Sequence, residues 1–163
     1  MIQPPEMKLN LPMQVADGAV STTTAVWDIL SASMRGDIEQ VKNLVSICPG
    51  LIYAQYNYTP PIHFAVREGH LPLVQYLLEM GAHDPSYKTY PFGESLVTIA
   101  QERGWKEIAN LLEAYSNQPG LCKYKGDNGA ILYQRTEQEL AFQKAVDDND
   151  LAATESILKV HPE

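Results

Sequence analysis

The chain has 163 residues, of which 45% are hydrophobic and 20% are charged, a balance typical of a folded globular protein. Twelve Lys and Arg against twenty Asp and Glu give a net charge of −8, which argues against nucleic-acid binding and against a polybasic membrane-binding cluster. No apolar run reaches the roughly 18 residues of a membrane span, and the N-terminus lacks a secretory-signal pattern. We therefore expect a soluble, cytoplasmic protein.

Residues 1–24 contain prolines and threonines but show no sustained hydrophobic period. We interpret them as an N-terminal tail that packs on the first structural unit. One of Thr22, Thr23 and Thr24 is expected to cap the first helix, since a hydroxyl at this position accepts a hydrogen bond from the first turn.

A repeat of about 33 residues follows the tail. Gly36 and Gly69 are 33 positions apart, Gly104 follows 35 positions later, and Asn149 takes the equivalent place after a further 45. In the second unit, apolar residues at helical spacing lie on both sides of Gly69, at 62–66 and 71–78. This pattern predicts two antiparallel helices joined by a left-handed turn at the glycine. One such pair cannot bury its own apolar face, so neighbouring pairs must stack.

The second unit resembles an ankyrin repeat. Its Pro60-Pro61-Ile62-His63-Phe64-Ala65 segment is similar to the T-P-L-H-x-A signature of that family, and residues 69–82 are similar to the family's second helix and closing Gly-Ala. The resemblance implies an all-α fold, an ankyrin-repeat helical solenoid of stacked helix-turn-helix pairs with β-hairpin fingers. It covers three repeats at 25–115.

Two segments follow the third repeat. Residues 116–139 carry Gly126-Asp127-Asn128-Gly129 between β-prone residues, which predicts either an extended hairpin finger or a linker between two arrays. Residues 140–163 read as a fourth, partial repeat. A repeat that breaks off in this way leads us to expect that the chain is a fragment of a longer protein.

No pattern predicts catalysis, a metal or a cofactor. The two cysteines, Cys48 and Cys122, are too few for a disulfide scaffold or a four-thiolate zinc site. The resemblance implies structural roles for His63 and His70, with His63 forming hydrogen bonds between neighbouring loops. His83 is expected in a loop, and the acidic run at 147–150 is expected to be a solvated turn. We therefore predict that the protein is not an enzyme.

The resemblance implies a binding surface on the concave face, formed by the fingers and by the turn ends of the first helices. Aromatic residues cluster around the fingers, where they either anchor a partner or pack finger on finger and against the tail. Tyr58 replaces the family's finger glycine, which argues against the usual tight turn. The predicted partner-binding positions are Met34, Arg35, Tyr56, Asn57, Thr59, Arg67, Glu68, Tyr90, Pro91, Phe92, Glu94, Glu102 and Arg103, and the clustered aromatics are Tyr53, Tyr56, Tyr58, Tyr87, Tyr90 and Phe92.

These observations predict a monomeric, non-catalytic module that binds a protein or peptide, with the acidic net charge favouring a basic partner. The alternative is a regulatory or localisation domain of a longer multidomain protein. An enzyme or a small-molecule site would instead require a deep pocket with converging polar groups.

Overall fold

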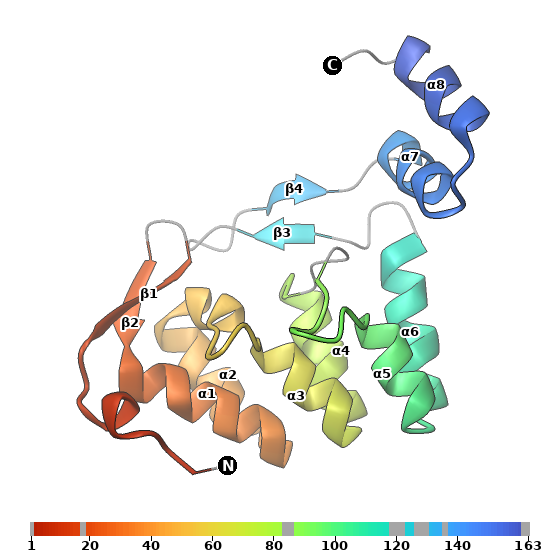
Figure 1. Cartoon of the computed structure of the whole chain (residues 1–163). Coiled ribbons are helices and arrows are strands. Elements are labelled where there is room, and N and C mark those ends of the chain that lie inside the picture. Colours follow the sequence, from red (N-terminus) through yellow and green to blue (C-terminus); the bar gives the residue numbers. More distant parts are fainter. Residues whose placement is uncertain are drawn as a thin grey trace.

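The structure, a computed structural model, describes residues 2–16, 19–82, 87–117, 123–125, 131–134 and 137–160. Most of these residues are helical (Figure 1). None of the helices in these ranges combines the length and the apolar composition that crossing a membrane requires.

The N-terminal segment is more regular than the irregular tail that the sequence predicts. It contains a 3₁₀ turn, η1 (Pro5–Lys8), and two antiparallel strands, β1 (Pro12–Ala16) and β2 (Ala19–Thr22). Met7, Val15 and Ala19 are buried, and the segment packs on the first helix and on a second 3₁₀ turn, η2 (Pro49–Tyr53). The tail therefore covers the outer side of the first helix pair, as the packing hypothesis requires.

The first helix pair consists of α1 (Thr23–Arg35) and α2 (Ile38–Ile47). Thr22 is the N-cap of α1, where its hydroxyl accepts a hydrogen bond from the Ala25 N–H at 3.2 Å. Asp37 caps α2 in the same way through the Gln40 N–H. Such side chains satisfy backbone donors that a helix start leaves free. The prediction of a threonine cap in this stretch is therefore confirmed.

Two further pairs follow, α3 (Pro61–Glu68) with α4 (Leu71–Glu79), and α5 (Leu96–Glu102) with α6 (Lys106–Asn117). Each of the three pairs turns at a left-handed glycine: φ is +74° at Gly36, +81° at Gly69 and +79° at Gly104. Residues that carry a side chain rarely adopt this backbone conformation, so each turn falls at a glycine. The interval between the glycines is therefore also the interval between the helix pairs. The predicted left-handed turns are confirmed.

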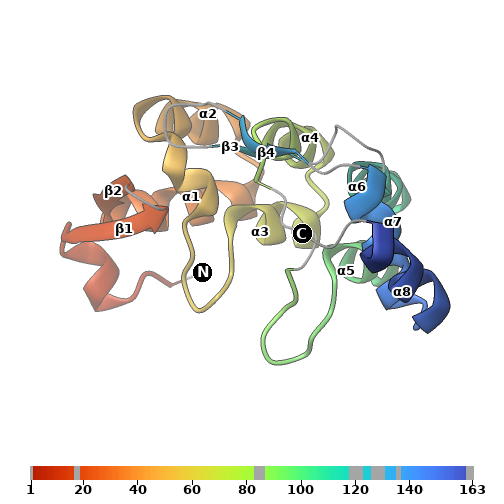
Figure 2. The same ribbon diagram turned by 90° about the horizontal axis from the view of Figure 1, so that it is seen from above.

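The three helix pairs lie side by side (Figure 1). Helix α3 packs against both α1 and α5, while α4 packs against α6. Seen from above, α2, α4 and α6 form one layer and α1, α3 and α5 form another, and the loops before α3 and α5 project beyond this second layer (Figure 2). We call this second layer with its loops the loop-bearing face. The core runs between the layers and includes the fully buried Leu30, Val41, Leu73, Leu77 and Leu112.

Rings from one pair cover the turn glycine of the pair before it. His70 lies over Gly36, and its Nε2–H donates to the Met34 carbonyl at 2.9 Å. Trp105 lies over Gly69 in the same way, and its Nε1–H donates to the Arg67 carbonyl at 3.4 Å. Each ring thereby ties one turn to the next, and we call this arrangement the turn ladder.

The side of α5 and α6 that faces away from the second pair is polar. Val66 and Leu78 are buried between the second and third pairs, at 0% and 2% exposure, whereas their equivalents 35 positions later are Gln101 and Glu113. These two side chains are exposed and hydrogen-bonded to each other at 3.2 Å. On this side, Gln101 and Glu113 therefore place polar groups where the second pair has apolar ones.

Beyond α6 the structure describes two strands and two helices. Strands β3 (Lys123–Lys125) and β4 (Ile131–Gln134) pair antiparallel, as the hairpin hypothesis requires, while the predicted turn at 126–129 lies outside the described residues. Helices α7 (Glu137–Asp147) and α8 (Leu151–Val160) turn at Asn149, whose φ is +53°. The choice between finger and linker, and the assignment of a fourth partial repeat, stay predictions.

The turn ladder predicts unequal costs at two glycines that share one backbone conformation. Gly69→Ala and Gly104→Ala each place a side chain at positive φ, which costs about 1 kcal/mol. A Cβ at Gly69 would also lie 2.6 Å from the Trp105 ring, whereas a Cβ at Gly104 has no neighbour within 4 Å. We expect Gly69→Ala to lower the free energy of unfolding by a further 1–3 kcal/mol, roughly the cost of overpacking. Urea denaturation of both variants measures this difference, and equal losses would contradict the ladder.

Candidate functional site

The loop before α3 forms a tight turn despite Tyr58. Tyr56 and Thr59 exchange backbone hydrogen bonds at 3.3 and 3.1 Å, and the two residues between them, Asn57 and Tyr58, have φ of +50° and +62°. Positive φ at both central residues is typical of a type I′ hairpin turn. The expectation that Tyr58 would prevent this turn was wrong. A left-handed tyrosine costs about 1–2 kcal/mol, and the surrounding bonds hold it there.

The loop before α5 is closed around one buried threonine. The Thr89 N–H donates to the Glu94 carbonyl at 2.9 Å, the Thr89 hydroxyl accepts from the Glu94 N–H at 3.0 Å, and the Gly93 N–H donates to the Thr89 carbonyl. Thr89 is buried, and this bonding leaves Tyr90, Pro91 and Phe92 outside, in contact with solvent.

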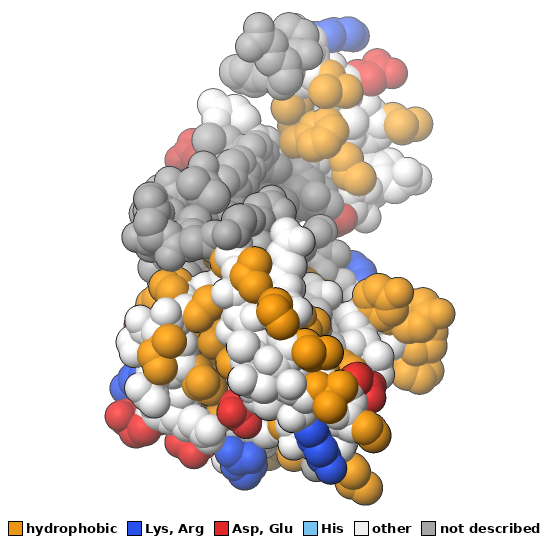
Figure 3. Space-filling model, turned by 90° about the vertical axis from the view of Figure 1, so that its left-hand side faces the viewer, with side chains coloured by type: hydrophobic (Ala, Val, Ile, Leu, Met, Phe, Trp, Pro, Cys, Tyr) orange, Lys and Arg blue, Asp and Glu red, His pale blue; other side chains and the backbone are white. Residues whose placement is uncertain are grey.

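Three aromatic side chains are exposed at the tips of these two loops: Tyr58 is 67% exposed, Tyr90 75% and Phe92 78%. We call them the fingertip aromatics. The rings of Tyr58 and Tyr90 come from different loops, and their centroids lie 5.4 Å apart with a 51° tilt. Figure 3 shows hydrophobic side chains that project from one edge of the molecule, on the side toward which the loops extend in Figure 2.

The other clustered aromatics pack inward. The Tyr56 hydroxyl donates to Glu6 of the N-terminal segment at 3.2 Å, and its ring meets Trp27 edge-on at 6.1 Å. Tyr53 and Tyr87 are half-buried against the core. The hypothesis of packing against the tail and finger on finger therefore holds for Tyr56, which packs on the N-terminal segment, and for Tyr58, which contacts Tyr90 of the next finger. Three rings stay exposed, and their anchoring of a partner stays a prediction. Tyr56 was a predicted binding position, and these contacts limit what it offers to a partner.

His63, in the first turn of α3, is hydrogen-bonded to the second loop, the one before α5. Its Nδ1 is hydrogen-bonded to the Tyr87 hydroxyl at 3.2 Å, and its ring contacts the rings of Phe64 and Tyr87 edge-on. Burial, and to a lesser extent the positive charges of Arg67 and Arg103, together lower the pKa of His63 from 6.5 to about 4. The imidazole is therefore neutral near pH 7, which suits a structural hydrogen bond.

Some of the predicted residues at the turn ends of the first helices are engaged by neighbouring side chains, and others are exposed to solvent. Arg67 forms an ion pair with Glu68 at 2.7 Å and lies over the Phe64 ring, 5.0 Å from its centroid. Arg35 donates to the Gln40 side chain at 2.9 Å, and Met34 packs against the core. Glu102 and Arg103 are exposed.

The predicted positions form two groups at opposite ends of helices α3 and α5. Asn57 and Thr59 precede α3, and Glu94 precedes α5, whereas the turn-end residues follow at the other ends, about 12 Å along an eight-residue helix. The positive charges of Arg67 and Arg103 act on His63 in the first turn of α3, where they help to lower its pKa. The two groups therefore belong to one layer of helices but are separated by the length of α3 and α5.

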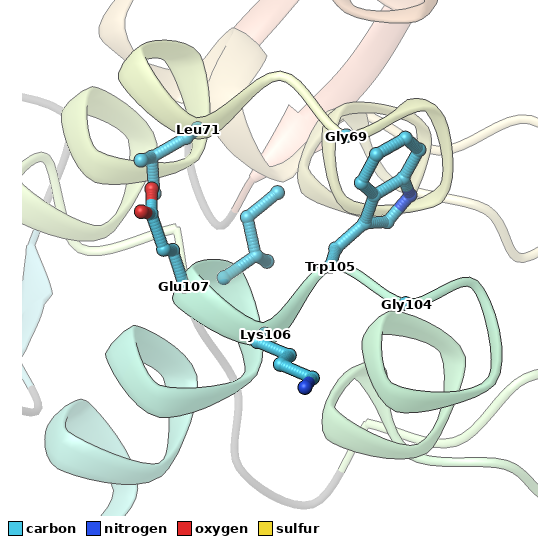
Figure 4. A pocket seen from close by; sticks show the side chains of 7 residues that line it. Gly69, Leu71, Gly104, Trp105, Lys106 and Glu107 are labelled. Carbon is cyan, nitrogen blue, oxygen red and sulfur yellow. The ribbon is translucent and has the colours of Figure 1, made fainter.

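A small pocket lies away from the fingers, where the second and third turns meet (Figure 4). Its volume is about 290 Å³, and Gly69, Leu71, Trp105, Lys106 and Glu107 are among the residues that line it. In Figure 4 the Lys106 side chain extends away from Glu107 and Trp105, so polar groups do not converge there. Within the described ranges, no three His, Cys, Asp or Glu side chains are grouped as a metal site requires. His83 lies outside these ranges.

The signal that sequence reasoning missed is the pairing of the two fingertips. Tyr58 belongs to the clustered aromatics but not to the predicted binding positions. Its place at the family's finger glycine is the signal in the sequence, because the structure holds it at positive φ with its ring exposed, and such backbone strain clusters at functional positions.

Comparison with known proteins identifies one segment directly. Residues 57–90 match the ankyrin repeat family, a stretch that runs from the first fingertip to the second and contains the Pro60–Ala65 segment. The resemblance to ankyrin repeats is confirmed there. The chain is also 31% identical over 86 residues to a protein of Oryza sativa subsp. japonica described as "Probable E3 ubiquitin-protein ligase XBOS33". This match covers 52% of the chain and 16% of that relative.

The lowered pKa of His63 predicts that stability falls on acidification. Since the folded-state pKa is about 4 and the unfolded value is 6.5, protonation favours the unfolded chain, and stability present above pH 6.5 is lost as the pH falls towards 4. We expect a loss of roughly 1–2 kcal/mol from this residue, less than the full shift implies because the ring is partly exposed. Urea denaturation at pH 7 and pH 4.5 should show a smaller pH effect in His63→Gln than in the native chain. An NMR titration of His63 with a midpoint near 6.5 would contradict the assignment.

Proposed function

We propose that residues 23–117 form an ankyrin-repeat solenoid of three repeats that works as a non-catalytic protein-interaction module. The ankyrin match at 57–90, the side-by-side helix pairs and the turn ladder support the repeat architecture. Ankyrin repeats are in general protein-interaction modules, which supports binding rather than catalysis as the class of function. A cytoplasmic, monomeric protein remains part of this proposal.

The fingertip aromatics are the observation that carries the proposal. Aromatic side chains bury a large area at the cost of few rotamers, and tyrosine is enriched among interface residues that dominate binding energy. Three such rings stand exposed on neighbouring loops, and one of them occupies a strained backbone position. Backbone hydrogen bonds close the tips of both loops, at 56–59 and 89–94, so ordering these tips on binding would cost little entropy.

The chemistry of the site favours binding over catalysis. His63 lies at the base of the second loop, and it is held neutral and engaged by Tyr87. Its contacts fit a residue that positions a loop, and a general base would require a pKa closer to the working pH.

A second candidate is a regulatory or localisation domain of a longer multidomain protein. The rice relative favours it, because the segment similar to this chain is 16% of a protein described as a ubiquitin ligase. The mass of the native gene product distinguishes the two candidates, since a product well above 18.2 kDa would support the second.

Removing two fingertip rings tests the proposal. We expect Tyr90→Ala with Phe92→Ala to reduce capture of the native partner from host lysate about tenfold or more, as loss of dominant interface residues does. Val20→Ala with Ile47→Ala is the matched control, because it removes exposed apolar side chains from β2 and α2. Quantitative mass spectrometry measures the capture, and unchanged melting curves verify folding. A captured set that neither variant alters would contradict binding at the fingertips.

A further inference from the structure

The outer parts of the two loops carry no charged side chain. In the whole chain 20% of the residues are charged, yet no Asp, Glu, Lys or Arg occurs at 56–59 or at 89–93, the segments that hold the fingertip aromatics. Lys88 and Glu94 flank the second segment and have opposite signs. A charged group buried on these rings would lose its hydration without gaining a countercharge, which costs free energy. The fingertip aromatics therefore favour an uncharged segment of a partner.

The backbone of both loops is already paired within each loop. Tyr56 and Thr59 exchange two backbone hydrogen bonds, and Thr89 is bonded to Gly93 and Glu94 through its N–H, its carbonyl and its hydroxyl. Addition of a partner strand requires free N–H and carbonyl groups along an edge, and these groups are not free. Recognition at the loop tips therefore depends on the side chains.

Two tyrosine hydroxyls are free beside the exposed rings. Within the described ranges, no hydrogen bond includes the hydroxyl of Tyr58 or of Tyr90, whereas that of Tyr87 is bonded to His63. The rings of Tyr58 and Tyr90 lie 5.4 Å apart and come from different loops. The two tyrosines therefore offer apolar ring surface and two O–H donors at one place.

We propose that Tyr58 and Tyr90 bind an uncharged, proline-containing segment of a partner protein. Its proline rings pack on the two aromatic rings, and its carbonyls accept hydrogen bonds from the two hydroxyls. Proline supplies an apolar ring and has no N–H that would need an acceptor on this surface. A proline-rich segment in the polyproline II conformation also leaves its carbonyls unpaired, and it loses little entropy on binding because it is already extended.

The inference rests on the proposed function and names the chemistry of the partner. It departs from the expectation of a basic partner, which was drawn from the net charge of the whole chain, because the segments 56–59 and 89–93 contain no carboxylate for a basic side chain. A single-stranded nucleic acid would stack its bases on the same rings, but its phosphates require cations that these segments lack.

Tyr58→Gly removes one of the two rings and keeps the turn. Asn followed by Gly is the pair that a type I′ turn prefers, so we expect the melting temperature to stay the same or to rise. Partner binding should weaken about tenfold or more, as it does when a dominant interface residue is lost. A residue with a structural role alone would not separate stability from binding in this way.

Selection from a library of random 12-residue peptides tests the inference without a known partner. The native chain is the bait, and the Tyr58→Gly variant removes peptides that bind elsewhere. We expect the retained peptides to be enriched in proline and to carry few charges. Added salt should change the affinity of such a peptide by no more than about twofold, because salt screens interactions between charges.

Phenylalanine variants test the two hydroxyls separately from the rings. We expect Tyr58→Phe with Tyr90→Phe to weaken binding of a retained peptide about threefold to tenfold, as loss of neutral hydrogen bonds does. Tyr76→Phe is the matched control, because it removes a hydroxyl from α4 in the other layer of helices, and it should leave binding within about twofold.

The outcomes separate this inference from the proposed function. Retained peptides that lack proline, that bind through Lys or Arg with strong salt dependence, or that ignore the loss of both hydroxyls would overturn the inference while the proposed function stands. A 12-nucleotide oligothymidine that displaces the peptides would also overturn it. A selection that yields no peptide dependent on Tyr58 would count against the inference, and against both if partner capture also ignores Tyr90→Ala with Phe92→Ala.

Discussion

Neighbouring helix pairs are held together by the apolar surface that they bury between them. Val66 and Leu78 of the second pair are covered by the third, and the fully buried Leu77 and Leu112 belong to the core that the pairs share. A helix pair alone would leave these side chains in water, at a cost of roughly 1.5–3 kcal/mol for each large residue. Each pair therefore depends on its neighbours, and the N-terminal segment covers the apolar side of the first pair.

The turn ladder converts this packing into a defined geometry. Apolar burial has little directional preference, so it cannot by itself fix where one pair lies against the next. The hydrogen bonds from His70 to Met34 and from Trp105 to Arg67 add direction, and each ring fits only because the residue beneath it is a glycine. With the helix pairs held in this way, the two loops project to the same side, and their tips come close enough for Tyr58 to contact Tyr90.

The sequence predicted the helix pairs because their signals are local or periodic. Apolar spacing, the glycine interval and the threonine cap each depend on a few neighbouring residues, and the structure confirms the left-handed turns that they imply. The directions of the aromatic side chains could not be predicted in the same way. Tyr56 and Tyr58 are two positions apart in one loop, yet Tyr56 packs on Glu6 and Trp27 while Tyr58 faces the next loop, since contacts from distant segments decide the outcome. The lowered pKa of His63 could not be predicted from composition either, because it depends on burial and on the charges of Arg67 and Arg103 from two different repeats.

We propose above that this protein meets its partner on the loop-bearing face. This proposal is tested by the ¹H–¹⁵N NMR spectrum of the labelled chain during a titration with a peptide ligand. The ligand is the tightest-binding peptide selected on the native chain from a random library, without counter-selection. Binding at this face should move the amide signals of the two loops, at 56–59 and 87–95, and of α3 and α5, while those of α2, α4 and α6 stay in place. Shifts concentrated on α2, α4 and α6, or around the pocket beside Trp105, would contradict it.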